Sequence, residues 1–230
     1  MSNYLVATIK AWNIEQFKQR TPNFAGNWSL ITENSELTLA NLREISPRYI
    51  FFPHWSWLVP EEILNEFECI CFHMTDVPYG RGGSPLQNLI SRGHQETKLS
   101  ALKMEKSLDT GPVYMKVPLS LNGSANDIFH DCAKLSFSMM SSIIDLQPIP
   151  SPQVGTVVEF QRRKPADSKL PQHTELLKLY NTIRMLDAES YPKAFIDYGN
   201  FKFEFNQARL NSETELVAQV KITVRDESSS

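Results

Sequence analysis

The chain has 230 residues, 41% of them hydrophobic, which is enough for one domain of ordinary size with a smaller appendage. Its formal net charge of -3 argues against a broad surface for nucleic acids or other polyanions. The N-terminal residues show no basic segment followed by a long apolar run, the pattern of a signal peptide, and no apolar stretch is long enough to span a bilayer. We therefore expect a cytoplasmic protein that does not bind membranes.

Strand-like and helix-like patterns alternate along the first part of the chain. The predicted strands are Asn3–Ile9, Trp28–Thr32, Arg48–Phe52, Glu68–Phe72, Lys98–Met104 and Val113–Val117. The predicted helices are Trp12–Arg20, Leu37–Ile45, Pro60–Glu66, Pro85–Arg92 and Ala125–Ile144. This rhythm favours an α/β fold with a doubly wound, mostly parallel sheet.

A proline-rich connector follows the long helix. Gln147–Pro152 reads QPIPSP, and prolines at this density interrupt regular structure. Beyond it we expect a strand, a helix and two paired strands, at Thr156–Gln161, His173–Leu186, Asn200–Leu210 and Glu213–Val224. The sequence therefore predicts two domains: residues 1–146, and a small α+β unit of a helix and a β-hairpin at residues 153–225.

The turn after the first strand disfavours a dinucleotide cofactor. The strand runs into Lys10-Ala11-Trp12-Asn13, with none of the glycines that let a backbone approach a pyrophosphate. The three cysteines (Cys69, Cys71 and Cys132) lack metal-ligand spacing, so we expect reduced thiols and no metal.

Two titratable residues stand where catalysis is expected. His73 follows a predicted buried strand, and Asp109 lies in a Ser-Leu-Asp-Thr-Gly turn. Ligands of open α/β sheets bind beyond the carboxyl ends of the strands. A ring and a carboxylate placed there suit proton transfer from an amine, so both are predicted to be catalytic.

The segment Cys71–Pro112 resembles the core of the 10-formyltetrahydrofolate-dependent formyltransferases, which include methionyl-tRNA formyltransferase and the sugar N-formyltransferases. The family pattern is Asn-x-His-x-Ser/Thr-x-x-Pro, a turn rich in Gly and Arg, and a distant Leu-Asp-Thr/Ala-Gly. The chain matches it at His73–Pro85 and Leu108–Gly111, including the separation of His73 from Asp109. Gln161–Asp167 and Asn181–Phe195 further resemble the sugar N-formyltransferases.

The resemblance implies a Rossmann-like fold and 10-formyltetrahydrofolate as co-substrate. It also implies that His73 stabilises a tetrahedral intermediate, while Asp109 orients His73 and accepts the amine proton. The residues implied to contact the folate are Trp57, Leu58, Val59, Gly83, Glu105, Lys106, Ser107 and Leu108. Those implied to contact the second substrate are Tyr79 and Arg81.

Cys71 departs from the family pattern. The family has Asn at this position, whose amide would donate to the oxyanion. A thiol is a weak donor, so that role is not carried over to Cys71. The alternating apolar residues around it suggest instead a small core residue in a strand buried on both faces.

The resemblance points to transfer of a formyl group to the amine of a nucleotide-linked deoxyamino sugar, as in surface polysaccharide biosynthesis. Three alternatives stay open: methionyl-tRNA formyltransferase, glycinamide ribonucleotide formyltransferase, and a binding protein with a decayed site. From residue 146 on, basic and acidic residues are equal in number, which disfavours an RNA surface. The expected partner is a nucleotide sugar rather than a nucleic acid, and a homodimer is left open.

Overall fold

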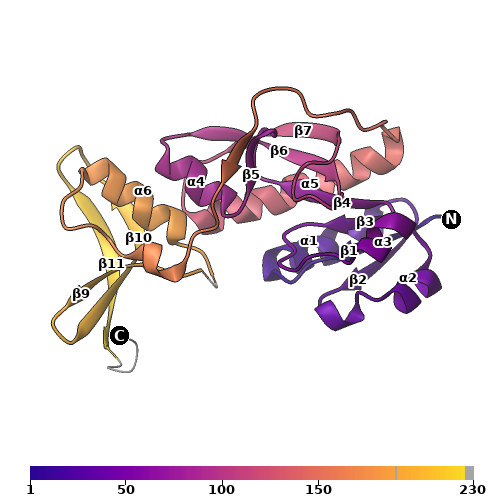
Figure 1. Cartoon of the computed structure of the whole chain (residues 1–230). Helices are drawn as coiled ribbons and strands as arrows, with labels where there is room; N and C mark the ends of the chain where they lie inside the picture. The colour runs from indigo at the N-terminus through magenta and orange to yellow at the C-terminus, as the bar shows by residue number, and fades with distance from the viewer. Residues whose placement is uncertain (190, 226–230) are drawn as a thin grey trace. The chain divides into compact units, whose positions relative to one another are not determined.

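The computed structural model, shown in Figure 1, describes residues 1–189 and 191–225. These residues form two compact units. The first comprises Met1–Pro85, Thr97–Leu119 and Phe129–Phe160. The second comprises Leu86–Glu96, Ser120–Ile128 and the described residues from Gln161 on.

The first unit is built on a six-stranded sheet with the order β2-β1-β3-β4-β6-β7. Its strands are β1 (Asn3–Ala7), β2 (Asn27–Ile31), β3 (Pro47–Phe52), β4 (Cys69–His73), β6 (Glu96–Lys103) and β7 (Val113–Ser120). The first four in chain order pair in parallel, whereas β6 pairs with β4 antiparallel. The predicted mostly parallel α/β sheet is therefore confirmed.

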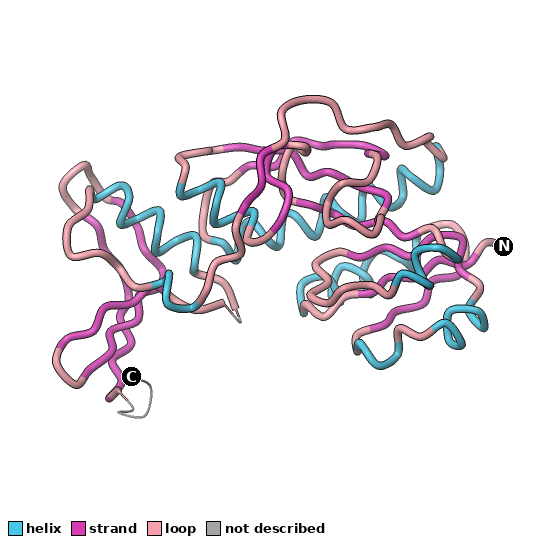
Figure 2. The backbone as a smooth tube through the Cα atoms, viewed as in Figure 1, coloured by secondary structure: helices cyan, strands magenta, loops and turns pink. Residues whose placement is uncertain are grey.

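Helices separate most of these strands along the chain, as the tube in Figure 2 shows. They are α1 (Ala11–Arg20), α2 (Leu39–Ile45), α3 (Glu61–Glu66), α4 (Pro85–Ser91) and α5 (Ala125–Leu146). Short 3₁₀ turns occur at Thr21–Asn23, Asn34–Glu36 and Pro165–Ser168. Each strand and helix predicted for the first 146 residues is present, with ends displaced by at most a few residues.

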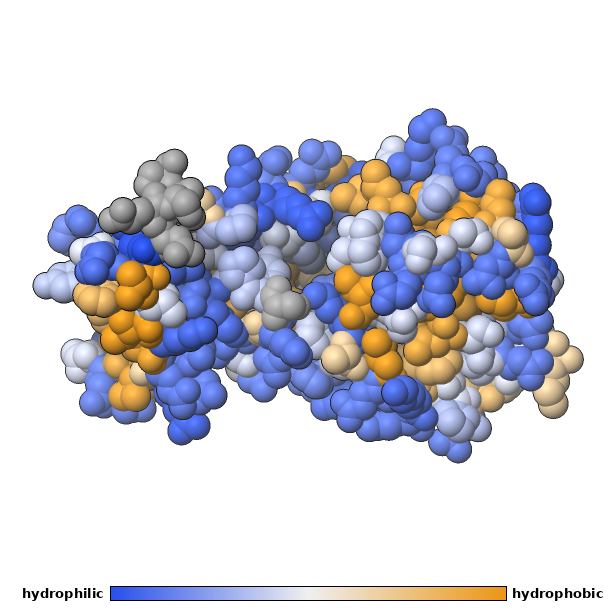
Figure 3. Space-filling view, turned by 90° about the horizontal axis from the view of Figure 1, so that it is seen from below, coloured by the Kyte–Doolittle hydropathy of each residue, from blue (hydrophilic) through white to orange (hydrophobic). Residues whose placement is uncertain are grey.

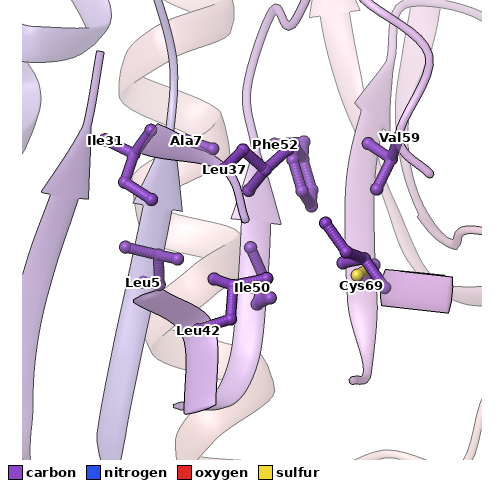
Figure 4. Close-up of a cluster of buried hydrophobic side chains, with 10 residues drawn as sticks. Leu5, Ala7, Ile31, Leu37, Leu42, Ile50, Phe52, Val59 and Cys69 are labelled. Atoms are coloured by element: carbon purple, nitrogen blue, oxygen red, sulfur yellow. The ribbon is translucent and has the colours of Figure 1, made fainter. Parts of the chain in front are cut away.

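The sheet is buried on both faces, as expected for parallel strands. On one face, side chains from β1, β3 and β4 meet those of α2 and α3 (Figure 4), and this cluster comprises Leu5, Ala7, Ile31, Leu37, Leu42, Ile50, Phe52, Val59, Ile63 and Cys69. The alternate residues of the same strands, among them Val6, Phe51 and Ile70, are also fully buried. Successive side chains of a strand point to opposite faces, so these apolar runs place apolar side chains on both faces of the sheet.

The strand order reverses beside β1. The chain steps from β1 outward to β2, and then to β3 on the other side of β1. Ligand sites of such sheets lie at the carboxyl ends of the strands near this reversal. Here those ends lead into Thr8, Pro53 and the loop after His73, and the buried Thr8 hydroxyl donates to the Pro53 carbonyl at 2.6 Å.

The second unit contains α6 (Leu176–Leu186) and an antiparallel sheet of β9 (Ala194–Tyr198), β10 (Phe201–Leu210) and β11 (Leu216–Val224), in the order β11-β10-β9. Orange patches interrupt the mainly hydrophilic surface in Figure 3. The apolar side chains exposed on this sheet include Tyr198, Val220, Ile222 and Val224. No helix within the described residues is both long and apolar enough to cross a membrane.

Two strands lie outside the predicted elements, and one of them shifts the boundary between the units. The unpredicted strands are β5 (Tyr79–Gly82) and β9. Because β5 pairs with β8 (Val158–Phe160), the connector and β8 belong to the first unit, which extends to Phe160. The observed division therefore differs from the expected limits at residues 146 and 153.

Candidate active site

β4 delivers His73 to the carboxyl edge of the sheet. It is the last residue of the strand and lies on the same face as Cys69 and Cys71, because residues two apart share a face. The strand pairs β3 on one side and β6 on the other, where His73 lies opposite Ser100. This central position fixes the backbone from which the imidazole projects.

The His73 ring lies between two oxygen acceptors. Its Nδ1 is 3.4 Å from Oδ1 of Asp109, and its Nε2 donates to the Gly80 carbonyl oxygen at 2.7 Å. Both side chains of the pair are only 9% exposed. The structure thus brings the two predicted catalytic residues together in a site largely shielded from solvent.

Asp109 occupies a turn that few residues would adopt. Its φ is +55°, in the left-handed region, where a non-glycine residue costs about 1–2 kcal/mol. Its Oδ2 accepts the Gly82 backbone N–H at 3.0 Å while Oδ1 faces His73. The turn therefore holds the carboxylate in one orientation, with a different partner for each oxygen.

The loop after β4 supplies the rest of the polar shell. The Thr75 hydroxyl also donates to the Gly80 carbonyl, at 3.2 Å, and the Thr75 carbonyl accepts from the Ser100 hydroxyl at 2.6 Å. Thr75 and Ser100 are fully buried. These contacts fix the position of the Gly80 carbonyl, and hence the orientation of the His73 ring.

The two segments predicted to contact folate lie side by side. Lys106 forms an ion pair at 3.0 Å with Glu61, which begins α3 just after Trp57–Val59. Val59 is buried in the core cluster. Three apolar side chains in these segments stay exposed: Trp57 (44%), Leu58 (85%) and Leu108 (62%).

Trp55 adds an unsatisfied donor next to Trp57. The two indole rings are 5.0 Å apart and meet edge to face. The Trp55 Nε1 is buried and has no hydrogen-bond partner within the described part of the chain. Buried donors are normally satisfied, so this N–H is suited to an acceptor from outside the protein.

The residues predicted to contact the second substrate lie on or next to β5. Tyr79 packs edge to face on Phe160, with ring centroids 5.5 Å apart, and the Gly83 N–H donates to the Phe160 carbonyl at 3.1 Å. Arg81 is implied by the resemblance to contact the second substrate, and within the protein it has a partner of its own. Its Nε and Nη2 donate to Oε1 of Gln153 at 3.1 and 2.8 Å.

Cys71 is packed against the core cluster. Burial raises the pKa of its thiol, and the nearby charge of Asp109 raises it further. The residue therefore keeps its proton near neutral pH.

Sequence reasoning missed Gln153, Thr75, Ser100 and the Gly80 carbonyl. Gln153 follows a proline-rich stretch that predicts only a connector. The sole available signal was its position: a long polar side chain beside prolines that hold the chain extended. Within residues 1–189 and 191–225 we find no cluster of side chains able to hold a metal ion.

Comparison with known proteins identifies the family to which the chain belongs. A solved methionyl-tRNA formyltransferase from Clostridium thermocellum is 43% identical, with a TM-score of 0.93, over 98% of this chain and 100% of that chain. The chain belongs to the formyltransferase family. Residues 165–223 also match a family model described as the methionyl-tRNA formyltransferase C-terminal domain.

More distant formyltransferases align over a smaller part of the chain, or are similar to it in fold alone. A methionyl-tRNA formyltransferase from Sinorhizobium medicae is 28% identical over 70% of this chain and 57% of its own length. The chain spans about half the length of the curated formyltransferases it matches. A sugar N-formyltransferase from Shewanella, at 14% identity and a TM-score of 0.70 over 90% of this chain and 97% of that one, shows the common fold.

Proposed function

We propose that this formyltransferase moves the formyl group of 10-formyltetrahydrofolate to a primary amine, with His73 and Asp109 as its catalytic residues. The observation that carries the proposal is their buried pairing at the end of β4. A shielded imidazole and carboxylate in contact can transfer a proton within the site instead of losing it to solvent.

In the proposed reaction, the neutral amine attacks the formyl carbon, and a C–N bond forms while the carbonyl oxygen becomes an oxyanion. His73 stabilises that oxyanion with its Nε2–H, which exchanges the Gly80 carbonyl for the oxyanion as the latter forms. Asp109 accepts the amine proton, directly or through water. The bond from carbon to N10 then breaks, N10 takes a proton, and tetrahydrofolate leaves. Donors aimed at such an oxyanion are worth about 10²–10³ in rate each.

The folate is proposed to lie against Trp57–Val59 and Glu105–Leu108, with Gly83 at its edge. Support comes from the exposed apolar side chains of the two adjoining segments and from the unsatisfied Trp55 N–H. A flat heterocycle with polar edges suits an apolar slot that offers a few hydrogen bonds.

For the amine we propose a nucleotide-linked deoxyamino sugar, with Tyr79 near it. Arg81 is proposed to lie beside the substrate, with its Nε and Nη2 held by Gln153. A small substrate agrees with the equal numbers of basic and acidic residues from residue 146 on, since polynucleotide surfaces gather positive charge. Methionyl-tRNA is the second candidate, favoured by the name of the 43% identical relative.

The test is a substrate panel with the purified full chain and 10-formyltetrahydrofolate, read by mass spectrometry of the products. The amines are nucleotide-linked sugars with amino groups at different ring positions, and methionyl-tRNA. We expect a formylated sugar nucleotide that is absent with Asp109→Asn. If methionyl-tRNA is the only amine formylated, it is the substrate, and the proposed amino sugar is wrong. No formylated product with any amine would contradict the proposed activity.

A further inference from the structure

Gln153 uses its whole amide inside the protein. Its Nε2 donates to the carbonyl oxygens of Asp109 and Gly111, both at 2.8 Å. Its Oε1 accepts two N–H groups from the Arg81 guanidinium. Two donors and two acceptor sites are all that a glutamine amide has, so no hydrogen-bonding capacity is left over.

This side chain turns inward from an otherwise exposed segment. Residues 151–157 are exposed at every position except Gln153, which is half-buried. Two backbone hydrogen bonds between Val113 and Ser151 hold the segment beside the strand that follows the Asp109 turn. The backbone path of this segment therefore directs the Gln153 side chain toward the protein.

The contacts of Gln153 complete a ring of interactions around the His73–Asp109 pair. Gly80 accepts from His73, and Gly82 donates to Asp109. Arg81, between these two glycines, reaches Gln153, and Gln153 holds the Asp109 turn from its other side. One amide thus ties together the two backbone segments that orient the pair.

We infer that Gln153 is a positioning residue for the catalytic pair, and that Arg81 fixes the direction of its amide. The inference rests on the proposed function, because positioning matters only if the pair is catalytic. Asp109 holds a φ in the left-handed region, and the bonds from Gln153 to the Asp109 and Gly111 carbonyls stabilise the turn in that conformation. Without them the turn relaxes, and a displacement of about 1 Å can cost on the order of 10²-fold in rate.

The side chain's chemistry offers a sharp test. Glutamate has the shape of glutamine and still accepts from Arg81, but its carboxylate cannot donate to the two carbonyls. Gln153→Glu should lower kcat about 10- to 100-fold while the KM for folate changes less than about two-fold. The matched control is Gln147→Glu, because exposed Gln147 lies on the same connector and accepts from Arg48 at 3.1 Å.

A second readout does not depend on turnover. The ¹⁵N signals of the His73 ring report which nitrogen carries a proton, and the chain has only 5 histidines to assign. We expect Gln153→Glu to change those signals and the pH profile of kcat, and Gln147→Glu to change neither. If the wild type formylates no amine, the ¹⁵N signals still decide whether Gln153 orients the pair.

Other outcomes would overturn the inference. Unchanged His73 signals with a normal kcat per folded molecule would show that Gln153 only stabilises the fold. If Gln153→Glu folds poorly, Gln153→Ala and Arg81→Ala can be compared with the double variant. We expect their losses of kcat to be coupled, since both act through one amide. Strictly additive losses would contradict the ring of interactions.

Discussion

His73 faces an oxygen acceptor at each ring nitrogen, a backbone carbonyl at Nε2 and a carboxylate at Nδ1. The carbonyl belongs to a tight, glycine-containing segment, whereas the carboxylate sits on a strained turn. An added Cβ at Gly80 would meet Thr75 at 2.7 Å and Phe160 at 2.8 Å, so only glycine brings this carbonyl so close. The ring orientation thus depends on a residue with no side chain.

Cys71 gives the first prediction at the scale of single residues. Replacing it with Asn should destabilise the protein by about 1–3 kcal/mol, because at this partly buried position the amide would pack against apolar side chains that offer it no partner. Cys71→Ala should be milder and keep most of its turnover, since the thiol donates little. Thermal unfolding and turnover of the two variants, measured together, check this. A stable but inactive alanine variant would show that the thiol itself is functional.

His54 gives a second prediction, concerning acid stability. Burial, together with the smaller effect of the nearby charge of Lys10, lowers the pKa of His54 to about 4. Below the usual value of 6.5 the unfolded chain binds a proton that the folded chain excludes, so stability is lost as pH falls toward 4.

A residue that replaces His54 must adopt the same positive φ. His54 has a φ of +59°, which Asn tolerates better than most residues. We expect the unfolding free energy of His54→Asn to depend less on pH between 6.5 and 4 than that of the wild type. Chemical denaturation across this range measures it. Parallel curves for the two proteins would show that other groups cause the acid loss.

At the scale of elements, the Asp109 turn is set by its approach to the end of β6. A Cβ added at Gly111 would lie 1.8 Å from the Lys103 carbonyl oxygen. Gly111→Ala should therefore cost about 1–3 kcal/mol of stability, as overpacking does, and lower turnover because the Asp109 turn must shift. Gly93→Ala is the control for backbone strain without a clash: Gly93 has a positive φ, which Gly111 does not, and no atom lies within 4 Å of a Cβ added there. Equal effects of the two changes would contradict this account of the turn.

The folate segments give a prediction at the same scale. Trp57 is exposed beside Trp55 and follows β3, where a bound heterocycle would change its surroundings. Titration with a reduced folate analogue should quench tryptophan fluorescence, and Trp57→Phe should remove most of that change. A calorimetric titration that stays flat at millimolar analogue would count against the slot.

Element prediction from sequence succeeded where periodicity is strong. Continuous apolar runs in β1, β3 and β4 and helical spacing in α5 are set by burial, so their existence and type were predicted correctly. β5 was missed because its residues are Tyr-Gly-Arg-Gly, and glycines lower strand propensity. β9 was missed because it directly follows a Tyr-Pro-Lys segment, which predicts a turn.

The site was foreseen only in part, and for a physical reason. His73 and Asp109 carry a recognisable pattern, and the structure places them in contact. Gly80 lies in the Gly- and Arg-rich turn of the family pattern, but a pattern of side chains does not show which carbonyl faces the ring, and the amide of Gln153 reaches the site from 44 residues away. Such contacts depend on how the loops pack, which a single sequence does not display.

At the scale of the whole molecule, the described chain combines a mostly parallel six-stranded sheet, an antiparallel three-stranded sheet and the two-stranded pairing of β5 with β8. The first unit carries the buried pair, the folate segments and the positioning contacts, all on or next to its mostly parallel sheet. The second unit ends in an antiparallel sheet with exposed apolar side chains, and it carries the match to the formyltransferase C-terminal domain. On our account, the chemistry therefore belongs to the first unit.

The most direct test of that account is single-turnover formyl transfer from 10-formyltetrahydrofolate to the best amine of the panel. The proteins compared are the wild type, His73→Ala and Asp109→Asn. Because positioned proton transfer contributes about 10²–10⁴-fold, we predict that each variant transfers formyl at least about 10²-fold more slowly while unfolding at the wild-type temperature. Near-normal transfer by either folded variant would contradict the assignment of His73 and Asp109 as the catalytic pair.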